Sequence, residues 1–210
     1  MSKPRIVIVG GGFAGLAAAR SIGPRYDVTL VDAKPDFEFI PNLHELVSRV
    51  KKPGMLTIGH GLLERLGHQF VCDQVVSVDP GWKAVVTRSG QRLEADALIL
   101  APGSGAAHTQ TPGVTQHALQ LRSVEAGGLI ADRVEDCAAA ARPGHPVYIT
   151  VIGGGYTGVE VLGEVLRIHL AVILADERLS LGDFFSIRRR FSEQRHQFFN
   201  DFCVCVFCLE

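Results

Sequence analysis

The sequence lacks the features that would place a protein across a membrane or on a nucleic acid. No apolar run reaches the roughly 18–20 residues that a bilayer-spanning helix needs. An excess of charge is also missing, because 21 basic residues stand against 22 acidic ones and the formal net charge is −1. A balanced chain of this kind carries no basic footprint for a nucleic acid or an anionic lipid surface. We therefore expect a cytoplasmic protein with no nucleic-acid partner.

Cysteine is scarce as well, and its placement excludes a disulfide framework. The five cysteines are odd in number, and three of them crowd the last eight residues. A reducing cytosol suits this usage, and we expect Cys72 and Cys137 to be buried as small apolar residues. A metal site is not indicated either, because the histidines show no ligand spacing. We interpret four of them as surface or satisfied core residues: His44, His60, His68 and His169.

Glycine, by contrast, is abundant, and it forms the pattern G-x-G-x-x-G twice. The first copy follows the apolar strand expected at residues 5–9 and opens a helix expected from Phe13 to Ile22. In this pattern Gly10 permits the tight turn, Gly12 lets a pyrophosphate approach the backbone, and Gly15 lets helix and strand pack closely. The free N–H groups and the positive end of the helix dipole then bind the phosphates. The first copy therefore predicts a dinucleotide site.

An acidic residue stands where such a site needs one. A second strand is expected over residues 27–31, and Asp32 ends it, about 20 residues beyond the first glycine. Its carboxylate can accept hydrogen bonds from a ribose diol. Strand, turn, helix and acid together make an ordinary glycine-rich turn an unlikely alternative.

The second copy follows an apolar strand expected at residues 147–152. Gly153, Gly155 and Gly158 hold the three glycine positions, and a helix is expected from Tyr156 to about His169. A strand at Leu170–Leu174 would carry the matching acid to Asp176 or Glu177. A carboxylate there favours NAD over NADP because it repels a 2′-phosphate. Arg178 nearby weakens this preference. The equal alternative is that Asp176 is a solvated loop residue with no role in binding.

Between the two copies the pattern changes to β-structure and one long helix. Strands at 69–79, 83–88 and 92–94 are predicted to form an antiparallel meander, and 97–100 a buried strand. Residues 35–42 read as a loop, His44 to Val50 as a short helix, and 123–141 as a helix with Ser123 as N-cap. The fold class is therefore α/β: a Rossmann-like domain with a parallel sheet plus a meander, then the start of a second Rossmann-like domain.

These motifs resemble those of the two-dinucleotide-binding-domain flavoproteins, the pyridine nucleotide-disulfide oxidoreductase superfamily. Leu98–Ser104 resembles the second FAD motif of that family, with Pro102 in place of threonine, and Val75–Asp79 resembles the segment that touches the adenine. Gly158–Glu164 resembles the family's helix opening, in which the position of Glu160 lies near the stacked flavin and nicotinamide. The resemblance covers roughly residues 4–167.

Within this superfamily the missing cysteines narrow the choice. Disulfide reductases carry a redox pair after the first βαβ unit, and the corresponding Pro41–Val47 has no cysteine. Phe39–Leu46 instead resembles the type II NADH:quinone dehydrogenases and their sulfide:quinone relatives. The sulfide enzymes need cysteines near the flavin, and Cys137 alone is weak evidence for that class.

The resemblance implies an FAD-dependent oxidoreductase that takes hydride from NAD(P)H and reduces a second acceptor, with a quinone as one candidate. It implies Glu160 as the catalytic residue at the stack, and peripheral membrane contact as a property of the full-length family. For FAD, the implied contacts are Gly10, Gly12, Phe13, Ala14, Gly15, Asp32, Lys34, Pro41, Val75, Ala101, Pro102 and Gly103. For NAD(P)H, they are Gly153, Gly155, Tyr156, Gly158 and Asp176.

The predicted domains are unequal. Residues 1–115 form the FAD-binding part, 116–146 a connecting helix segment, 147–180 a partial NAD(P)-binding domain, and 181–210 an atypical tail. The tail ends in an apolar stretch, 202–208, with high β propensity and no expected partner. This pattern suggests a C-terminally truncated or frameshifted chain. A non-catalytic remnant with at most weak nucleotide binding is therefore the alternative to the oxidoreductase, and a single-nucleotide Rossmann dehydrogenase is a third, less favoured hypothesis.

Overall fold

The structure is a computed structural model that divides into two units. It describes residues 2–81, 83–104, 113–140, 148–175 and 205–209, with side chains left out at 169–175 and 205–209. Unit 1 comprises Met1–Glu38 and Thr57–Gly105, and unit 2 comprises Phe39–Leu56 and Ala106–Glu210. In the described residues no helix is both long and apolar enough to cross a membrane.

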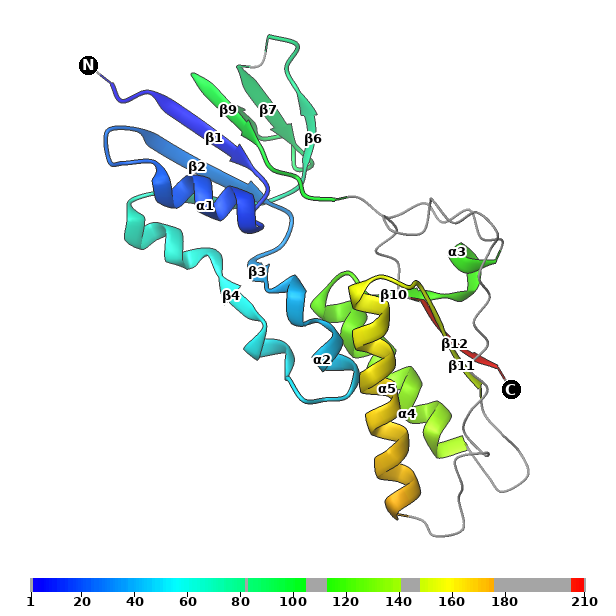
Figure 1. The fold of residues 1–210 in the computed structure, drawn as a ribbon. Helices are drawn as coiled ribbons and strands as arrows, with labels where there is room; N and C mark the ends of the chain where they lie inside the picture. The colour runs from blue at the N-terminus through cyan, green and yellow to red at the C-terminus, as the bar shows by residue number, and fades with distance from the viewer. Residues whose placement is uncertain (1, 82, 105–112, 141–147, 176–204, 210) are drawn as a thin grey trace. The chain divides into compact units, whose positions relative to one another are not determined.

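A four-stranded parallel sheet forms the centre of unit 1, with helix α1 (Phe13–Ser21) beside it (Figure 1). In spatial order its strands are β5 (Gln69–Cys72), β2 (Asp27–Asp32), β1 (Arg5–Val9) and β9 (Ala97–Leu100). Ile8 on β1 pairs with Leu30 on one side and Ile99 on the other. Ile8 and Leu30 are fully buried, as expected of a parallel strand that is covered on both faces. The predicted strand–turn–helix–strand unit is confirmed.

The meander of unit 1 is shorter than the sequence pattern predicts. Strands β6 (Val75–Val78), β7 (Ala84–Thr87) and β8 (Arg92–Glu94) pair antiparallel in that order. The predicted strand at 69–79 is wrong as one element, because its first part is β5 and lies parallel to β2. Asp73 and Gln74 break the run, which frees β5 to continue the parallel sheet. Buried Val85 and Ala95 pack with Val7 and Val31 of that sheet.

Residues between the sheet strands form a small addition that the pattern does not predict. Strands β3 (Asp36–Glu38) and β4 (Thr57–Gly59) pair antiparallel. The 3-10 helix η3 (His60–Leu66) then leads into β5, and its Leu63 is buried with Ile8 and Leu30. β3 falls within the predicted loop at 35–42, so that interpretation is wrong for this stretch. Three-residue strands have too few alternating positions to stand out in a sequence.

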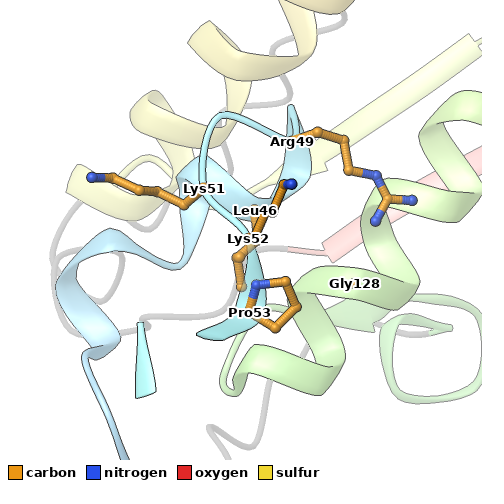
Figure 2. Close-up of a pocket in the computed structure, with 6 residues that line it drawn as sticks. All are labelled: Leu46, Arg49, Lys51, Lys52, Pro53 and Gly128. Atoms are coloured by element: carbon orange, nitrogen blue, oxygen red, sulfur yellow. The ribbon is translucent and has the colours of Figure 1, made fainter. Parts of the chain in front are cut away.

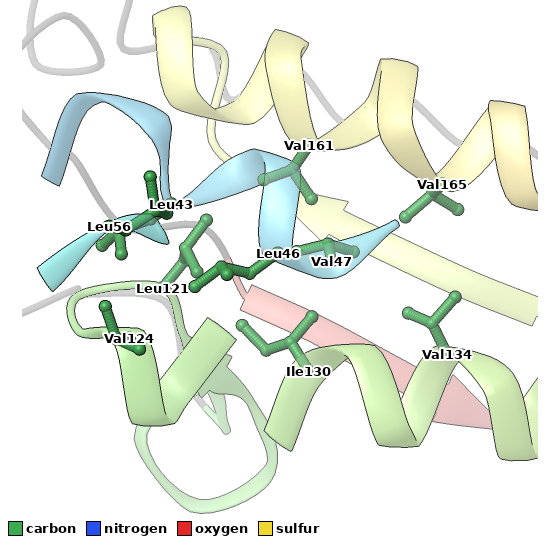
Figure 3. Packing of buried hydrophobic residues seen from close by; sticks show 10 residues of the cluster. All are labelled: Leu43, Leu46, Val47, Leu56, Leu121, Val124, Ile130, Val134, Val161 and Val165. Atoms are coloured by element: carbon green, nitrogen blue, oxygen red, sulfur yellow. The ribbon is translucent and has the colours of Figure 1, made fainter. Parts of the chain in front are cut away.

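Three helices build the core of unit 2: α2 (His44–Val47), α4 (Val124–Ala140) and α5 (Tyr156–Ala175). Figure 3 shows α2 between α5 and α4, with apolar side chains from all three facing one another. The N-cap predicted for α4 is present, because the Ser123 hydroxyl accepts a hydrogen bond of 3.1 Å from the Ala126 N–H. The 3-10 helices η1 (Ile40–Asn42) and η2 (Pro53–Met55) flank α2. The buried members of this core are Leu43, Leu46, Val47, Leu56, Leu121, Val124, Ile130, Val134, Val161 and Val165.

A three-stranded sheet completes the described part of unit 2, preceded by the short helix α3 (Val114–His117). Its order is β10 (Leu119–Gln120), β12 (Cys205–Leu209) and β11 (Tyr148–Ile152), and β12 runs antiparallel to both neighbours. The expectation that the apolar tail has no partner is therefore wrong for β12. An apolar strand with high β propensity pairs readily with an open strand edge, and β11 offers one.

The strand predicted at Leu170–Leu174 is also wrong. These residues continue α5, which runs without interruption from Tyr156 to Ala175. Periodicity cannot separate a short apolar run in a strand from one in a helix. No glycine or proline interrupts the helix between Gly163 and this run, so the helix continues through it.

Candidate functional site

The first glycine turn joins β1 to α1 at the carboxyl end of the parallel sheet. Gly10 adopts φ +101°, a conformation that residues with a side chain rarely take. A Cβ at Gly10 would lie 2.1 Å from the carbonyl oxygen of Ala101, and one at Gly15 would lie 1.8 Å from the carbonyl oxygen of Gly10. The turn therefore requires glycine at both positions even without a bound nucleotide.

Gly12, the middle glycine of the motif, is in a different environment. In the described part of the chain, no atom beyond Gly12 and its two sequence neighbours lies within 4 Å of the position that a Cβ would take there. Gly12, Phe13 and Ala14 are all exposed where α1 begins, and Gly12 is its N-cap residue. An open, side-chain-free backbone at a helix N-terminus fits a pyrophosphate. These residues therefore fit the phosphates of a dinucleotide.

Asp32 is fixed against the same turn by two backbone hydrogen bonds. Its Oδ2 accepts a bond of 2.5 Å from the Gly11 N–H, and its Oδ1 accepts one of 2.7 Å from the Lys34 N–H. The Gly10 N–H donates to the carbonyl oxygen of Val31 at 2.8 Å. Each carboxylate oxygen can accept more than one hydrogen bond. The acid predicted from the sequence thus lies at the turn with capacity left for a ribose hydroxyl.

The other residues predicted for the first cofactor divide between the two units. Ala101 donates its N–H to the Val9 carbonyl at 2.8 Å, and Gly103 adopts φ +73°. The Lys34 ammonium pairs with Glu38 at 2.7 Å. Val75 lies in β6 of unit 1, whereas Pro41 lies in η1 of unit 2. Pro102 follows β9 beside the first turn, 3.3 Å from the Cβ position of Gly10.

The second glycine turn repeats the construction of the first. Gly153 adopts φ +124°, and a Cβ at Gly158 would lie 2.0 Å from the Gly153 carbonyl oxygen. Among the described residues, no atom beyond its two sequence neighbours lies within 4 Å of the Cβ position of Gly155. The first helical hydrogen bonds also correspond: Val159 N–H to Gly155 O at 3.1 Å matches Leu16 N–H to Gly12 O at 3.0 Å. This turn too offers open backbone at a helix N-terminus.

The side chains after the second turn are less enclosed. Tyr156 is 85% exposed. Glu160, the predicted catalytic residue, lies with Oε2 3.3 Å from Nδ1 of His44 on α2. The interpretation of His44 as an unremarkable residue missed this contact, because a lone histidine in a sequence carries no sign of its partner. Asp176 and Glu177 lie outside the described residues, so the matching acid of the second site stays a prediction.

His60 is a further residue that the sequence did not reveal. It is 2% exposed, and neither ring nitrogen has a hydrogen-bond partner in the described part of the chain. Its Cε1 and Nε2 would lie 2.5 and 2.6 Å from a Cβ at Gly11, and Phe70 packs on the ring at 4.6 Å between centroids. Burial lowers the pKa of His60, while Asp32 and Asp36 oppose that shift. His68 is buried as well, and the expectation of a satisfied core histidine holds for one ring nitrogen only. Its Nε2 lies 2.9 Å from the Ala19 carbonyl oxygen, whereas its Nδ1 has no hydrogen-bond partner among the described residues.

The described residues contain no cluster of acidic, histidine or cysteine side chains able to hold a metal ion. The predicted burial of the two cysteines has a different outcome for each. Cys137 is 6% exposed, as predicted, but it is disulfide-bonded, so its interpretation as a small apolar residue outside any disulfide is wrong. Cys72 is exposed, so its predicted burial is wrong. It ends β5 at the sheet edge, with its Sγ 4.0 Å from the Ala33 carbonyl oxygen.

A cavity of about 160 Å³ lies in unit 2, apart from both turns in the sequence (Figure 2). Figure 2 shows the Arg49 side chain extended toward α4, where its guanidinium binds Asp132 at 2.5 Å and Glu135 at 2.9 Å. These two carboxylates raise the pKa of Arg49 and fix its charge. The lining residues are Leu46, Arg49, Lys51, Lys52, Pro53 and Gly128. The charge of Arg49 is thus already neutralised by carboxylates of the protein.

Known relatives are similar in sequence to this chain over most of its length. A demethylphylloquinone reductase from Synechocystis is 28% identical over 188 residues, which are 80% of this chain and 46% of the relative. Ferroptosis suppressor protein 1 from Taeniopygia guttata is 31% identical over 185 residues, 83% of this chain and 46% of the relative. The chain thus spans less than half the length of these relatives.

Solved structures agree on the fold. The structure of NDH2 from Plasmodium falciparum in complex with NADH superposes with a TM-score of 0.67 at 23% identity, over 81% of this chain and 39% of that one. The family model described as pyridine nucleotide-disulphide oxidoreductase matches residues 4–196, which include both glycine turns. The chain belongs to the pyridine nucleotide-disulphide oxidoreductase family.

Proposed function

We propose that this chain is an FAD-dependent oxidoreductase that receives hydride from NAD(P)H and delivers the electrons to a second acceptor. The observation that carries this proposal is the pair of matching turns. Each begins with a glycine at positive φ, ends with a helical glycine closed against that first glycine, and leaves the middle glycine open. A chain that needs one nucleotide has no use for two such turns. Membership of the family supports the same conclusion.

The residues of the first turn would hold the FAD. The open backbone at Gly12 and the α1 N-terminus would bind the pyrophosphate, and Asp32 would accept hydrogen bonds from the ribose. At the second turn, Gly155 and the N-terminus of α5 would bind the pyrophosphate of NAD(P)H. The bound cofactors would supply the hydride chemistry between nicotinamide C4 and flavin N5. Glu160, one turn into α5, would contact the nicotinamide side of the stack.

A quinone is the acceptor that the relatives favour. Their names include a demethylphylloquinone reductase, an NAD(P)H-ubiquinone oxidoreductase of Arabidopsis thaliana and a sulfide-quinone reductase of Aquifex aeolicus. Quinones of this kind are lipid-soluble, so the proposal includes a cytoplasmic protein with peripheral contact to a membrane. The partial NAD(P)-binding domain at residues 147–180 belongs to the same proposal.

The sheet of unit 2 favours a second candidate, a non-catalytic nucleotide binder. In the first turn β1 has parallel neighbours on both sides, and one of them carries Asp32. In the described residues β11 pairs only with β12, which runs antiparallel and begins where β11 ends. An antiparallel neighbour does not bring an acid at its carboxyl end to the turn. The second turn would then bind its nucleotide weakly.

A flavin titration of the purified chain separates the two candidates. The oxidoreductase should bind FAD with a visible shift of the flavin spectrum, and NADH should bleach that spectrum under anaerobic conditions. Reoxidation by a soluble quinone would then support the proposed acceptor. If the chain binds FAD and NADH does not bleach it, the second candidate stands and the oxidoreductase proposal is wrong. The Gly12→Ala variant is the control for specific binding at the first turn.

A further inference from the structure

Two polar contacts join α2 to α5, one helical turn apart, and they differ in how their charge is balanced. His44 and Ser48 lie four residues apart at the start and the C-cap of α2, and Glu160 and Glu164 lie four residues apart on α5. His44 contacts Glu160, and Ser48 contacts Glu164. Residues four apart share one helix face, so both contacts lie on the same seam. Val47 and Val161, which lie in sequence between the contact residues of α2 and of α5, are buried in the core of unit 2 (Figure 3).

The Ser48–Glu164 contact is closed. The Ser48 hydroxyl donates to Oε2 of Glu164, and Arg167 lies 3.3 Å from that same oxygen. Arg167 also donates to the Ser48 hydroxyl at 3.1 Å. The Glu164 side chain is only 18% exposed. A permanent cation therefore neutralises this carboxylate, and the contact has the form of a structural ion pair.

The His44–Glu160 contact is open. The Glu160 side chain is 44% exposed, and the imidazole of His44 is its one cation-forming neighbour in the described part of the chain. The His44 side chain is only 17% exposed, because its neighbours Leu43 and Leu46 are packed in the core. The packing of α2 therefore fixes the imidazole, whereas the carboxylate keeps one side free for a ligand.

We propose that His44 is a positioning residue for Glu160, holding its carboxylate at the open end of the α2–α5 seam beside the bound nicotinamide. This inference rests on the proposed function. A nicotinamide ring gains positive charge as it gives up hydride. A carboxylate fixed in advance near that ring stabilises the charge without having to reorganise. Without His44, the glutamate side chain would sample several rotamers and lose most of this effect.

Matched variants at the two contacts test this role in the FAD-loaded chain. His44→Phe should slow the bleaching of the flavin by saturating NADH about tenfold while changing the KM for NADH less than twofold. This effect is smaller than the ~100-fold or greater loss seen for a buried oxyanion donor, since solvent reaches Glu160. His44→Asn should restore much of the rate, because an asparagine amide nitrogen stands as many bonds from Cβ as Nδ1 does. Ser48→Ala, at the closed contact, should lower the melting temperature and leave the rate unchanged.

The outcomes that overturn the inference are separate from those that overturn the proposed function. Normal bleaching in His44→Phe, or equal slowing in His44→Phe and Ser48→Ala, rejects the role of His44 while the oxidoreductase stands. A chain that binds FAD but is not bleached by NADH rejects the oxidoreductase, and the inference with it. A thermal double-mutant cycle of His44→Phe and Glu160→Gln in the cofactor-free chain tests the contact itself. Additive shifts in melting temperature reject it, and non-additive shifts support it.

Discussion

The two glycine turns have nearly the same local geometry and very different surroundings. Both use a glycine at positive φ and a second glycine packed against its carbonyl oxygen. The first turn is also held by Ala101, which follows β9, and by Asp32 from β2. Among the described residues, no strand lies beside the second turn in the way that β2 lies beside the first. The comparison shows that a few glycines specify the turn, whereas the neighbouring strands specify the rest of the nucleotide site.

The glycines closed against backbone should show the largest effects. In Gly15→Ala the new Cβ would meet the Gly10 carbonyl at 1.8 Å, and in Gly158→Ala it would meet the Gly153 carbonyl at 2.0 Å. Backbone cannot yield cheaply, so we expect each to lose about 3 kcal/mol or more of unfolding free energy. Gly15→Ala should also abolish FAD binding, whereas Gly158→Ala should retain it. Urea unfolding followed by circular dichroism, with FAD titrations, measures both quantities.

Gly128→Ala is the matched control for these two substitutions. Gly128 lies in α4, and among the described residues no atom outside the helix backbone lies within 4 Å of its Cβ position, so alanine should stabilise the helix by about 0.5–1 kcal/mol. Loss of FAD binding in Gly158→Ala would contradict the comparison, because the first turn could then not bind its nucleotide without an intact second turn.

Substitution of Asp32 should have the next largest effect on stability and on FAD binding. Among the described residues, the second turn has no acidic residue in the corresponding place. Asp32→Ala removes two charge-assisted hydrogen bonds, from Gly11 and from Lys34. Hydrogen bonds to charged groups contribute about 1.5–3 kcal/mol, so the variant should lose about that much stability and bind FAD more weakly. Asp32→Asn keeps one acceptor oxygen and should lose less. Thermal melts and FAD titrations check this, and unchanged values in both variants would show that the aspartate does not organise the turn.

The burial of His60 in unit 1 predicts that the stability of the folded chain depends on pH. Its pKa is lowered in the folded chain because the ring is buried beneath the first turn, so the unfolded chain binds the proton more readily. Stability therefore falls as the pH drops below the ordinary value of about 6.5, by at most about 1.4 kcal/mol for each pH unit. His60→Phe should flatten this slope while its ring keeps the contact with Phe70. Melting temperatures between pH 5 and 7.5 test the prediction, and a parallel slope in the variant would place the titrating group elsewhere.

The parts of the chain that the sequence predicts well are those that local signals specify. The strand, glycine turn and helix over residues 5–21 and the N-capped helix after Ser123 depend on neighbours in sequence. Long-range packing decided the rest. Residues 69–72 joined the parallel sheet through pairing with β2, and β12 found β11 as its partner.

The site residues follow the same division. The glycines and Asp32 are recognisable from spacing alone. His44 and His60 are not, because their environments come from elements far away in sequence, α5 and the first turn. A single histidine in a sequence gives no information about the residues that pack around it in the fold. The sequence therefore predicts no particular role for either histidine.

The smallest change in stability is expected at the open glycines, and there the two turns should behave alike. In Gly12→Ala and Gly155→Ala the new Cβ meets no atom of another described residue within 4 Å, sequence neighbours aside, so each should cost only roughly 0.5 kcal/mol, the scale of a weakened helix N-cap. Each new methyl group would nevertheless occupy the space through which a pyrophosphate approaches the backbone. We therefore expect Gly12→Ala to weaken FAD binding about tenfold, or roughly 1.4 kcal/mol, and Gly155→Ala to weaken NADH binding by a similar factor. Calorimetric titrations with each nucleotide measure the effects separately. If Gly12→Ala weakens FAD binding while Gly155→Ala leaves NADH binding unchanged, the second turn has the backbone geometry of a nucleotide site but does not bind the nucleotide. Open backbone alone would then be insufficient for binding.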